Sequence, residues 1–283
     1  MTRIIDLSLA IDEHAPEPFP VKITRTGHAE GSDNIGRRFI YKKTDALREK
    51  LRKLLLYWTG RRRIDARSFP DGMFLSHESV EASVHCGTHV DSAFHFGPVN
   101  GGAPARKIDE LPLEWCYGNA VVLDMTHLAP SAEITTADVE AALDKAGHEL
   151  KPGDIALIRT GADRHFGRPE YFFRFPGMGS GAVGYLLDRG VRVIGTDAPG
   201  LDRPGAAMVE DYYRTGDSKY LWPAHLLGRQ REYCHVERLA NLGSLPRPHG
   251  FVFACFPVKI KNTGAAWTRA VAIFEDAPTP APP

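Results

Sequence analysis

The chain lacks several features that would assign it to a membrane, a nucleic acid or an oxidising compartment. No apolar run in its 283 residues approaches the length of a membrane span. Lys and Arg together number 35, as do Asp and Glu, so no excess charge predicts a nucleic-acid or membrane partner. The N-terminus leads directly into a strand-like pattern, without the basic and then apolar segments of a signal peptide. We therefore expect a cytoplasmic globular protein that acts on a small molecule.

Cysteine is also scarce. The four cysteines are scattered and form no CxxC pair, which is typical of buried thiols in a reducing compartment rather than of a disulfide framework. Cys86 lies beside the candidate metal ligands described next, so a role as a soft ligand stays open. In a strand, however, its side chain would point to the face opposite that of His85.

What the chain does have is a dense group of imidazoles in one short segment. His85, His89 and His95 lie within eleven residues, together with Asp91. Two imidazoles four residues apart, with a carboxylate two residues later, can surround one divalent cation. A single His in such a place is more often a hydrogen-bonded structural residue. The joint spacing favours a metal site over that alternative.

The motif is expected on a strand rather than on a helix. Residues 78–84 before it, and Phe94 and Phe96 after it, alternate in the manner of a strand. Gly87 disfavours a helix and permits a tight bend or a close backbone approach to an ion.

The remaining pattern predicts an α/β protein with a mixed, mainly β sheet and flanking helices. Helices are expected from Thr135 or Thr136 to 144 and at 180–188, and strands at 4–11, 118–124, 153–159, 191–195, 251–256 and 269–274. We expect one catalytic domain over 1–276, with a basic helical insertion at about 16–71 and a disordered tail at 277–283. The insertion carries a helix at 45–57, capped by Thr44 or Asp45. Its basic residues are expected to be a solvated face, or alternatively a lid or dimer arm.

The motif His85-x-Gly87-Thr88-His89-x-Asp91, with His95 four residues later, resembles the signature of the metal-dependent cyclase family. That family includes kynurenine formamidases, isatin hydrolases and actinomycete aromatic polyketide cyclases. The resemblance continues through residues 5–8, 153–161, 193–197 and 201–202, and His225 and Glu237 match the spacing of the family's second His and its Glu. Residues 221–225, 231–234, 237–239 and 255–271, with the long insertion, are most similar to the polyketide cyclases. Ala93 and Gly200 depart from the usual Pro and Ser of the family, but neither change removes a ligand.

The resemblance implies a single α/β domain of the swivelling β/β/α type and a set of site residues. His85, His89 and Asp91 would bind a first Zn²⁺ or Mn²⁺, and His225 and Glu237 would join Asp91 around a second ion in two-metal members. Taken alone, His225 would be a packed His in a turn and Glu237 a surface residue. His95 is the candidate for proton transfer, because an imidazole exchanges protons near neutral pH.

Two reactions suit these ligands. The preferred hypothesis is aldol-type ring closure on an aromatic polyketide (poly-β-ketone) intermediate in secondary-metabolite biosynthesis. The alternative is hydrolysis of an amide or lactam, as in a formamidase or an isatin hydrolase. A non-catalytic binding protein on the same fold is disfavoured by the intact ligand set. The resemblance also implies a homodimer or a larger homo-oligomer.

Overall fold

The computed structural model describes residues 1–275, so the tail expected at 277–283 lies outside the described residues. The described chain divides into two compact units. Residues 1–19 together with 83 onward form one, called here the sheet unit, and Pro20–Ala82 form the other, called the insert. No helix in the described part of the chain combines the length and apolar character needed to cross a membrane.

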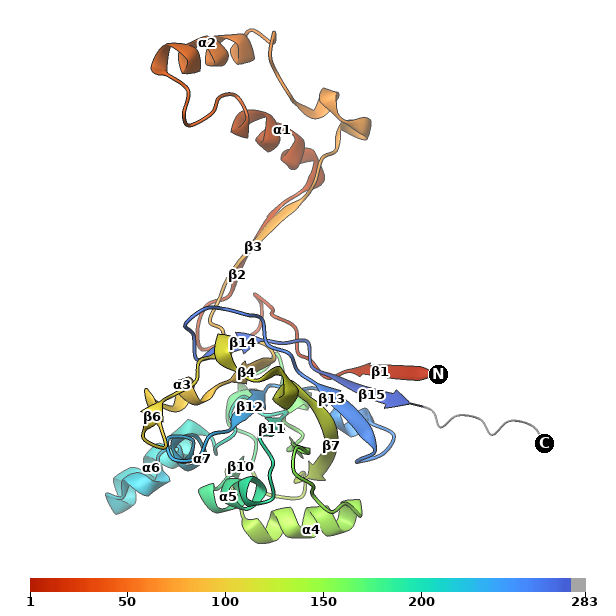
Figure 1. The fold of residues 1–283 in the computed structure, drawn as a ribbon, viewed down its shortest axis with the longest axis vertical. Coiled ribbons are helices and arrows are strands. Elements are labelled where there is room, and N and C mark those ends of the chain that lie inside the picture. Colours follow the sequence, from red (N-terminus) through yellow and green to blue (C-terminus); the bar gives the residue numbers. More distant parts are fainter. Residues whose placement is uncertain (276–283) are drawn as a thin grey trace, which may run out of the picture. The chain divides into compact units, whose positions relative to one another are not determined.

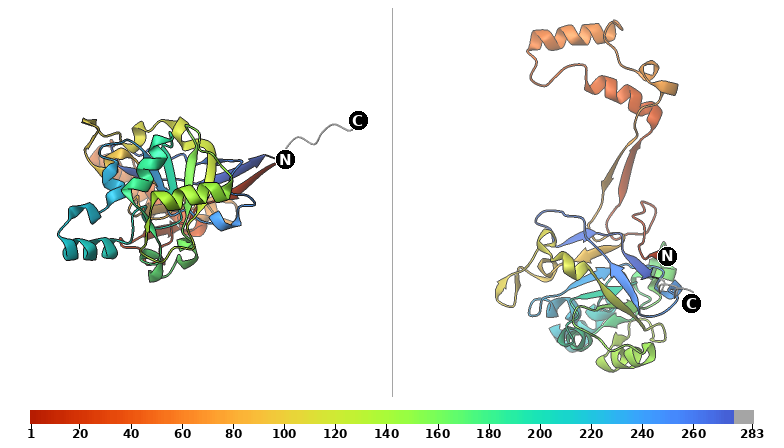
Figure 2. Two further views of the ribbon diagram at one scale, coloured as in Figure 1. Left: turned by 90° about the horizontal axis from the view of Figure 1, so that it is seen from below. Right: turned by 45° about the vertical axis from the view of Figure 1, so that its right-hand side comes forward.

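The sheet unit is built around one mixed nine-stranded sheet (Figures 1 and 2). Its spatial order is β1 (Thr2–Asp6), β15 (Val271–Glu275), β13 (Phe251–Ala254), β7 (Tyr117–Asp124), β9 (Ile155–Arg159), β11 (Val193–Thr196), β12 (Cys234–Glu237), β4 (His89–Asp91) and β14 (Ala265–Trp267). The four strands β7, β9, β11 and β12 are parallel, and antiparallel strands extend the sheet on both sides. The α/β class with a mixed sheet is therefore confirmed.

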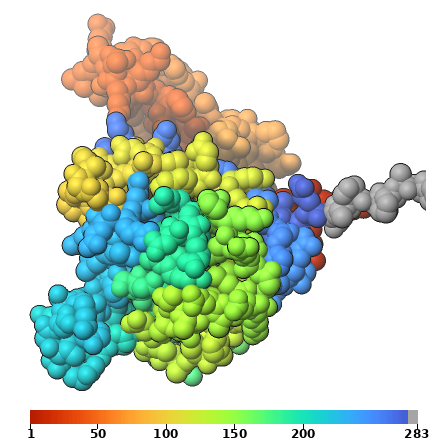
Figure 3. All heavy atoms as spheres, turned by 60° about the horizontal axis from the view of Figure 1, so that its bottom comes forward, coloured from red at the N-terminus to blue at the C-terminus, as the bar shows by residue number. Residues whose placement is uncertain are grey.

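Helices α4 (Thr136–Ala146) and α5 (Ser180–Asp188) cover one face of the parallel strands and form the side turned to the viewer in Figure 3. Val139 and Leu143 of α4 and Val183 and Leu186 of α5 pack there in one buried cluster with side chains of β7, β9 and β11. The opposite faces of the same strands enter a second cluster with β13, β15 and β1. A strand buried on both faces needs an almost continuous apolar sequence, as Ile155-Ala156-Leu157-Ile158 has.

The remaining elements of the sheet unit are short. The helices are α3 (Ala93–Phe96), α6 (Gly205–Thr215) and α7 (Pro223–Leu227). Two small two-stranded pairs are β5 (Val99–Asn100) with β6 (Ala103–Pro104), and β8 (Glu133–Ile134) with β10 (Gly177–Met178). The 3₁₀ turns are Ile108–Glu110, Leu113–Cys116, Ala162–His165, Pro169–Phe172, Ser218–Tyr220 and Leu242–Ser244.

Most of the predicted elements are present, with shifted ends. Helix α5 has the predicted bounds, and Thr135 caps α4 by accepting the backbone N–H of Asp138. The first strand, expected over 4–11, ends at Asp6. The reason is that Ser8 turns its backbone N–H to the Asp6 carboxylate at 3.1 Å and forms only an isolated bridge with Leu239.

The insert is a two-stranded ribbon that carries two helices. Strands β2 (Lys22–Thr26) and β3 (His77–Glu81) pair antiparallel, and α1 (His28–Arg38), α2 (Leu47–Trp58) and the 3₁₀ turns Ala66–Ser68 and Pro70–Gly72 lie between them. The compact unit thus extends through β3, beyond the expected end at about 71. Helix α2 has no side-chain cap, because Asp45 instead accepts the Lys53 ammonium at 2.7 Å. Leu47, Leu51, Leu55 and Trp58 form an exposed apolar stripe along α2.

The backbone at Gly177 lies so close to the backbone of residues 202–203 that a side chain at this position should destabilise the sheet unit. A Cβ on Gly177 of β10 would lie 2.1 Å from the backbone nitrogen of Arg203 and 2.2 Å from the carbonyl carbon of Asp202. We therefore expect Gly177→Ala to lower the free energy of unfolding by about 2–3 kcal/mol, because two backbone segments must separate. The measurement is urea unfolding followed by circular dichroism.

Gly181→Ala in α5 is the matched control. Its nearest obstacle is the Thr136 hydroxyl at 3.5 Å, so the new methyl group fits. Ala is the better helix former, and this variant should be as stable as the parent or more stable by about 0.5–1 kcal/mol. Equal unfolding midpoints for the two variants would contradict the assigned close approach.

Candidate metal centre

The pairing of β4 with β12 places four polar side chains on one buried face of the sheet. In this antiparallel register Asp91 lies opposite His235, and His89 lies opposite Glu237. Directly opposed residues project to the same side of a sheet. Alternation sends Val90 and Val236 to the other side, where both join the apolar core. His89, Asp91 and His235 are completely buried, and Glu237 is nearly so.

The turn before β4 brings His85 to this face and orients His89. Gly87 adopts a left-handed conformation with φ +59°, which favours glycine, and its carbonyl oxygen accepts the Nδ1–H of His89 at 3.0 Å. That bond leaves Nε2 of His89 as the free nitrogen. Thr88 anchors the turn, because its hydroxyl accepts the N–H of Leu9 at 2.7 Å and donates to the carbonyl of Arg238.

The segment after β4 does not continue as a strand, so the alternation expected at Phe94 and Phe96 is wrong. These residues belong to the single helical turn α3. The backbone N–H of His95 bonds to the Ser92 carbonyl at 2.9 Å, and Gly264 lies so close to His95 that a Cβ there would meet its Cα at 3.0 Å. The turn directs the His95 side chain back toward Asp91, four residues earlier.

His225 comes from α7 and is held by Asp202. The carboxylate of Asp202 accepts the backbone N–H of Ala224 at 2.6 Å and of His225 at 3.1 Å. It also accepts the Nδ1–H of His225 at 2.5 Å. The Nε2 atom of His225 is thereby turned toward Glu237, 3.7 Å from Oε1. A carboxylate on the far nitrogen is the usual way in which proteins orient a metal-binding imidazole.

Two carboxylates lie between the imidazoles. Oδ1 of Asp91 lies 3.1 Å from Nδ1 of His85 and 3.6 Å from Nε2 of His89. Oδ2 of Asp91 lies 2.9 Å from Nε2 of His235 and 3.7 Å from Nε2 of His95. Oε2 of Glu237 faces His89 at 3.5 Å. All six predicted site residues are therefore brought together.

Proximity of opposite charges shifts the protonation of these groups in the metal-free protein. Burial alone disfavours the charged form of His89, but Asp91 and Glu237 outweigh it and raise the pKa of His89 to about 10. Burial likewise opposes the charge on His225, and Asp202 raises its pKa to about 9. Burial would raise the pKa of Glu237, yet the neighbouring imidazoles, His235 first, lower it to about 2.

His95 behaves differently. Partial burial lowers its pKa, and the neighbouring imidazoles lower it further against the pull of Asp91, to about 4. Its side chain is 33% exposed, whereas the side chain of Asp91 is fully buried. His95 is thus a neutral and accessible imidazole beside a charged centre.

Comparison with known proteins fits this geometry. The Cyclase family model matches residues 5–203. The chain belongs to the Cyclase family. A kynurenine formamidase of Salinibacter ruber is 29% identical over 232 residues, which cover 79% of this chain and 88% of that protein. Proteins of this kind are enzymes, and so is this family member.

Solved structures share the fold. Isatin hydrolase A from Ralstonia solanacearum superposes with a TM-score of 0.69 at 22% identity, over 97% of this chain and 92% of that one. A protein from Bacillus stearothermophilus, described as a predicted metal-dependent hydrolase, gives a TM-score of 0.58 at 19% identity, over 97% and 100%. At these identities the likeness concerns the fold alone.

Two residues of the centre were not predicted from the sequence. His235 lies among the potential ligands, and Asp202 orients His225. The alternation His235-Val236-Glu237 in a strand was the available signal for the first. Cys86, by contrast, is buried and belongs to neither group of potential ligands found among the described residues. Burial raises the pKa of its thiol, which disfavours the thiolate that a metal requires.

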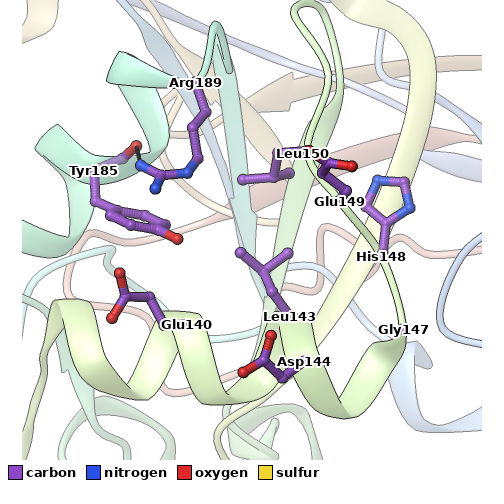
Figure 4. Close-up of a pocket in the computed structure, with 9 residues that line it drawn as sticks. All are labelled: Glu140, Leu143, Asp144, Gly147, His148, Glu149, Leu150, Tyr185 and Arg189. Carbon is purple, nitrogen blue, oxygen red and sulfur yellow. Dashed lines mark hydrogen bonds between the residues drawn. The ribbon is translucent and has the colours of Figure 1, made fainter.

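A separate hollow of about 740 Å³ lies between α4, α5 and residues 147–150 (Figure 4). The guanidinium of Arg189 covers the Tyr185 ring at 3.4 Å from its centroid. The one imidazole on its wall, His148, pairs with Asp154 at 2.9 Å. None of the six predicted site residues lines this hollow.

The raised pKa values of His89 and His225 lead to a prediction about ion binding. At pH 7 the imidazoles of His89 and His225 carry protons in the metal-free protein, and a cation binds the neutral form. Binding should therefore release protons, and affinity should rise with pH up to about 9–10, by roughly tenfold per pH unit for each proton displaced. Calorimetric titration with Zn²⁺ at pH 7, in two buffers of different ionisation enthalpy, counts these protons. A count of zero would contradict the charge state assigned here.

Proposed function

We propose that this enzyme is a metal-dependent hydrolase that cleaves the C–N bond of a small amide or lactam. The observation that carries the proposal is the convergence of His85, His89, His95, His225 and Glu237 on the buried carboxylate of Asp91. A fully buried carboxylate among imidazoles is expensive to maintain unless positive charge neutralises it.

The donor set fits one or two divalent cations. Oδ1 of Asp91 is buried, makes no hydrogen bond of good geometry among the described residues, and faces the nitrogens of His85 at 3.1 Å and His89 at 3.6 Å, a position that suits an ion held between them. His85, His89 and Asp91 would hold a first ion, and Asp91, His225 and Glu237 a second. Nitrogen and carboxylate donors suit Zn²⁺ or Mn²⁺. Such ions supply Lewis acidity, which polarises a carbonyl and makes water more acidic.

His95 is the proposed proton carrier. Its low pKa leaves Nε2 free to accept a proton from an attacking water at neutral pH. The same nitrogen can then deliver that proton to the departing amine, which completes hydrolysis without a net change in the enzyme. Its partial exposure gives water and substrate access, whereas the groups proposed as ligands to the second ion are more deeply buried.

We prefer hydrolysis to polyketide ring closure, the reaction that the sequence pattern favoured. The same ligands serve both reactions, so the choice depends on relatives. The relatives reported above carry the names kynurenine formamidase and isatin hydrolase, and both names denote hydrolases, which supports the hydrolase alternative.

The deciding experiment is an activity assay of the purified chain, loaded with Zn²⁺ or Mn²⁺, on an open-chain amide and on a cyclic amide. N-formylkynurenine and isatin are the probes, and loss of each is followed by absorbance. Turnover of either, abolished by a chelator and restored by the ion, supports the proposal. Absence of turnover on both, together with cyclisation of a poly-β-ketone, would overturn it in favour of the cyclase.

Replacing His95 should separate chemistry from ion binding. We expect His95→Ala to keep the metal content of the parent and to lower kcat by about 10²–10⁴, the usual contribution of a proton-transfer group. Metal content is measured by elemental analysis and kcat with the better of the two probes. The exposed residue His127 provides the control, because His127→Ala should leave both quantities unchanged. A fully active His95→Ala would remove His95 from the mechanism.

His89→Ala should have the opposite signature. This substitution removes a fully buried nitrogen donor beside both carboxylates, so metal content and activity should fall together. Full metal occupancy in this variant would contradict the proposed first site.

A further inference from the structure

His235 is the imidazole of the centre that the proposed ligand set does not use. We infer that His235, through Nε2, is a fourth protein ligand of the second cation, beside Asp91, His225 and Glu237. The inference rests on the proposed metal-dependent function and assigns a residue that the family motif does not contain.

Its position is fixed by the backbone. Because His235 lies directly opposite Asp91 in the β4–β12 pairing and two residues before Glu237, all three side chains point to the same face. Its ring packs edge-on against His225 at 4.6 Å and Phe96 at 5.0 Å between centroids. Phe96 in turn stacks on Tyr233. Such packing holds Nε2 in place before any ion arrives.

Within the described part of the chain, the polar contacts of this side chain run through one nitrogen. Nε2 lies 2.9 Å from Oδ2 of Asp91 and 3.3 Å from Oε1 of Glu237. Nδ1 is buried and has no hydrogen-bond partner among the described residues. A buried His kept for structure alone normally satisfies both of its nitrogens. Here one nitrogen faces two carboxylates at once, and a single N–H can serve only one of them well.

The donor atoms form a compact set. One donor atom each from Asp91, His225, His235 and Glu237 lie within 4.8 Å of one another. Two imidazole nitrogens and two carboxylate oxygens complete the fourfold coordination typical of Zn²⁺ in proteins. An imidazole binds an ion through an unprotonated nitrogen, and Nε2 is the nitrogen of His235 that faces the two carboxylates. The extra nitrogen also favours Zn²⁺ or Co²⁺ over Mg²⁺ at this site.

The alternative is that His235 donates a hydrogen bond to Asp91 and binds no ion. His235→Gln distinguishes the two, because the Gln amide can still donate to the carboxylate but is a poor ligand. His148→Gln is the matched control, since it removes another His–carboxylate pair, His148 with Asp154 at 2.9 Å, outside the centre.

The full chain is stripped with a chelator, reloaded with Zn²⁺ and freed of unbound ion by gel filtration. Elemental analysis gives the ions per chain, and titration with Co²⁺ followed by visible absorbance gives affinity and coordination. We expect two ions in the parent and in His148→Gln. In His235→Gln we expect one ion, or a second that binds at least about tenfold more weakly, with an altered Co²⁺ spectrum.

Other results separate the inference from the proposed function. Two ions bound with unchanged affinity in His235→Gln would overturn the role of His235 and leave the function intact. One ion in both the parent and this variant, with equal affinity, would also overturn it. A parent chain that binds no ion would remove the proposed function itself.

If His235→Gln does not fold, as judged by circular dichroism, His235→Cys decides. A thiolate binds Zn²⁺ and Co²⁺ but offers no hydrogen bond to Asp91. Retention of the second ion, with a sulfur-to-Co²⁺ absorption band, supports ligation. Loss of the second ion in the folded Cys variant would overturn it.

Discussion

The structure depends on the burial of two carboxylates, Asp91 and Glu237, side by side on one face of a sheet. Two like charges in a low-dielectric interior repel each other and lose their hydration. The fold meets this constraint by surrounding them with five imidazoles. Burial opposes the charge on Asp91, but the charge of His89 and the hydrogen bonds from His235, His85 and His89 hold its pKa well below the usual range. In the metal-free protein the compensating charge is carried by protons, and in the metal-loaded protein divalent cations would take their place.

The supporting structure follows from where the parallel strands end. Glu237 is the last residue of β12, and the segment after β11 carries Asp202 and the Leu201 N–H, which bonds to Glu237 at 3.0 Å. That segment is itself anchored by Asp197, which accepts the N–H of Thr160 at 2.7 Å and of Gly161 at 2.8 Å after β9. The site thus lies on the face of the sheet at the carboxyl end of β12, close to the usual position for ligands in open α/β sheets.

Arg238 shows how tightly this edge is constrained. It adopts a left-handed conformation at φ 60°, unusual for a side chain of its size, directly after Glu237. Its guanidinium is buried and lies 2.6 Å from the Glu17 carboxylate. The backbone N–H of Arg238 donates to the Ala198 carbonyl at 2.9 Å. Removal of either charge of this pair would leave the other buried and unpaired. The N-terminal segment is in this way joined to the strand that supplies Glu237.

The sequence revealed the parts of the centre that are close together along the chain. The spacing along the chain predicted a metal site at His85, His89, Asp91 and His95. The resemblance to the family added His225 and Glu237. Asp202 and His235 were missed because their meaning depends on contacts with residues far away in the chain. His235 lies 144 positions from Asp91, and only the strand register places them together. Helical periodicity located α4 and α5 well, whereas α3 is too short to show any period.

Unequal exposure within the centre bears on the reaction. His85 and His95 have side chains 32% and 33% exposed, whereas those of His89, Asp91 and His235 are fully buried. Solvent and substrate must therefore arrive on the side of His85 and His95, since the sheet closes the opposite side. Ring closure on a reactive poly-β-ketone calls for exclusion of water, while hydrolysis consumes it. A proton carrier that water reaches directly, beside a centre in which only His85 of the proposed ligands is comparably exposed, suits the proposed hydrolysis.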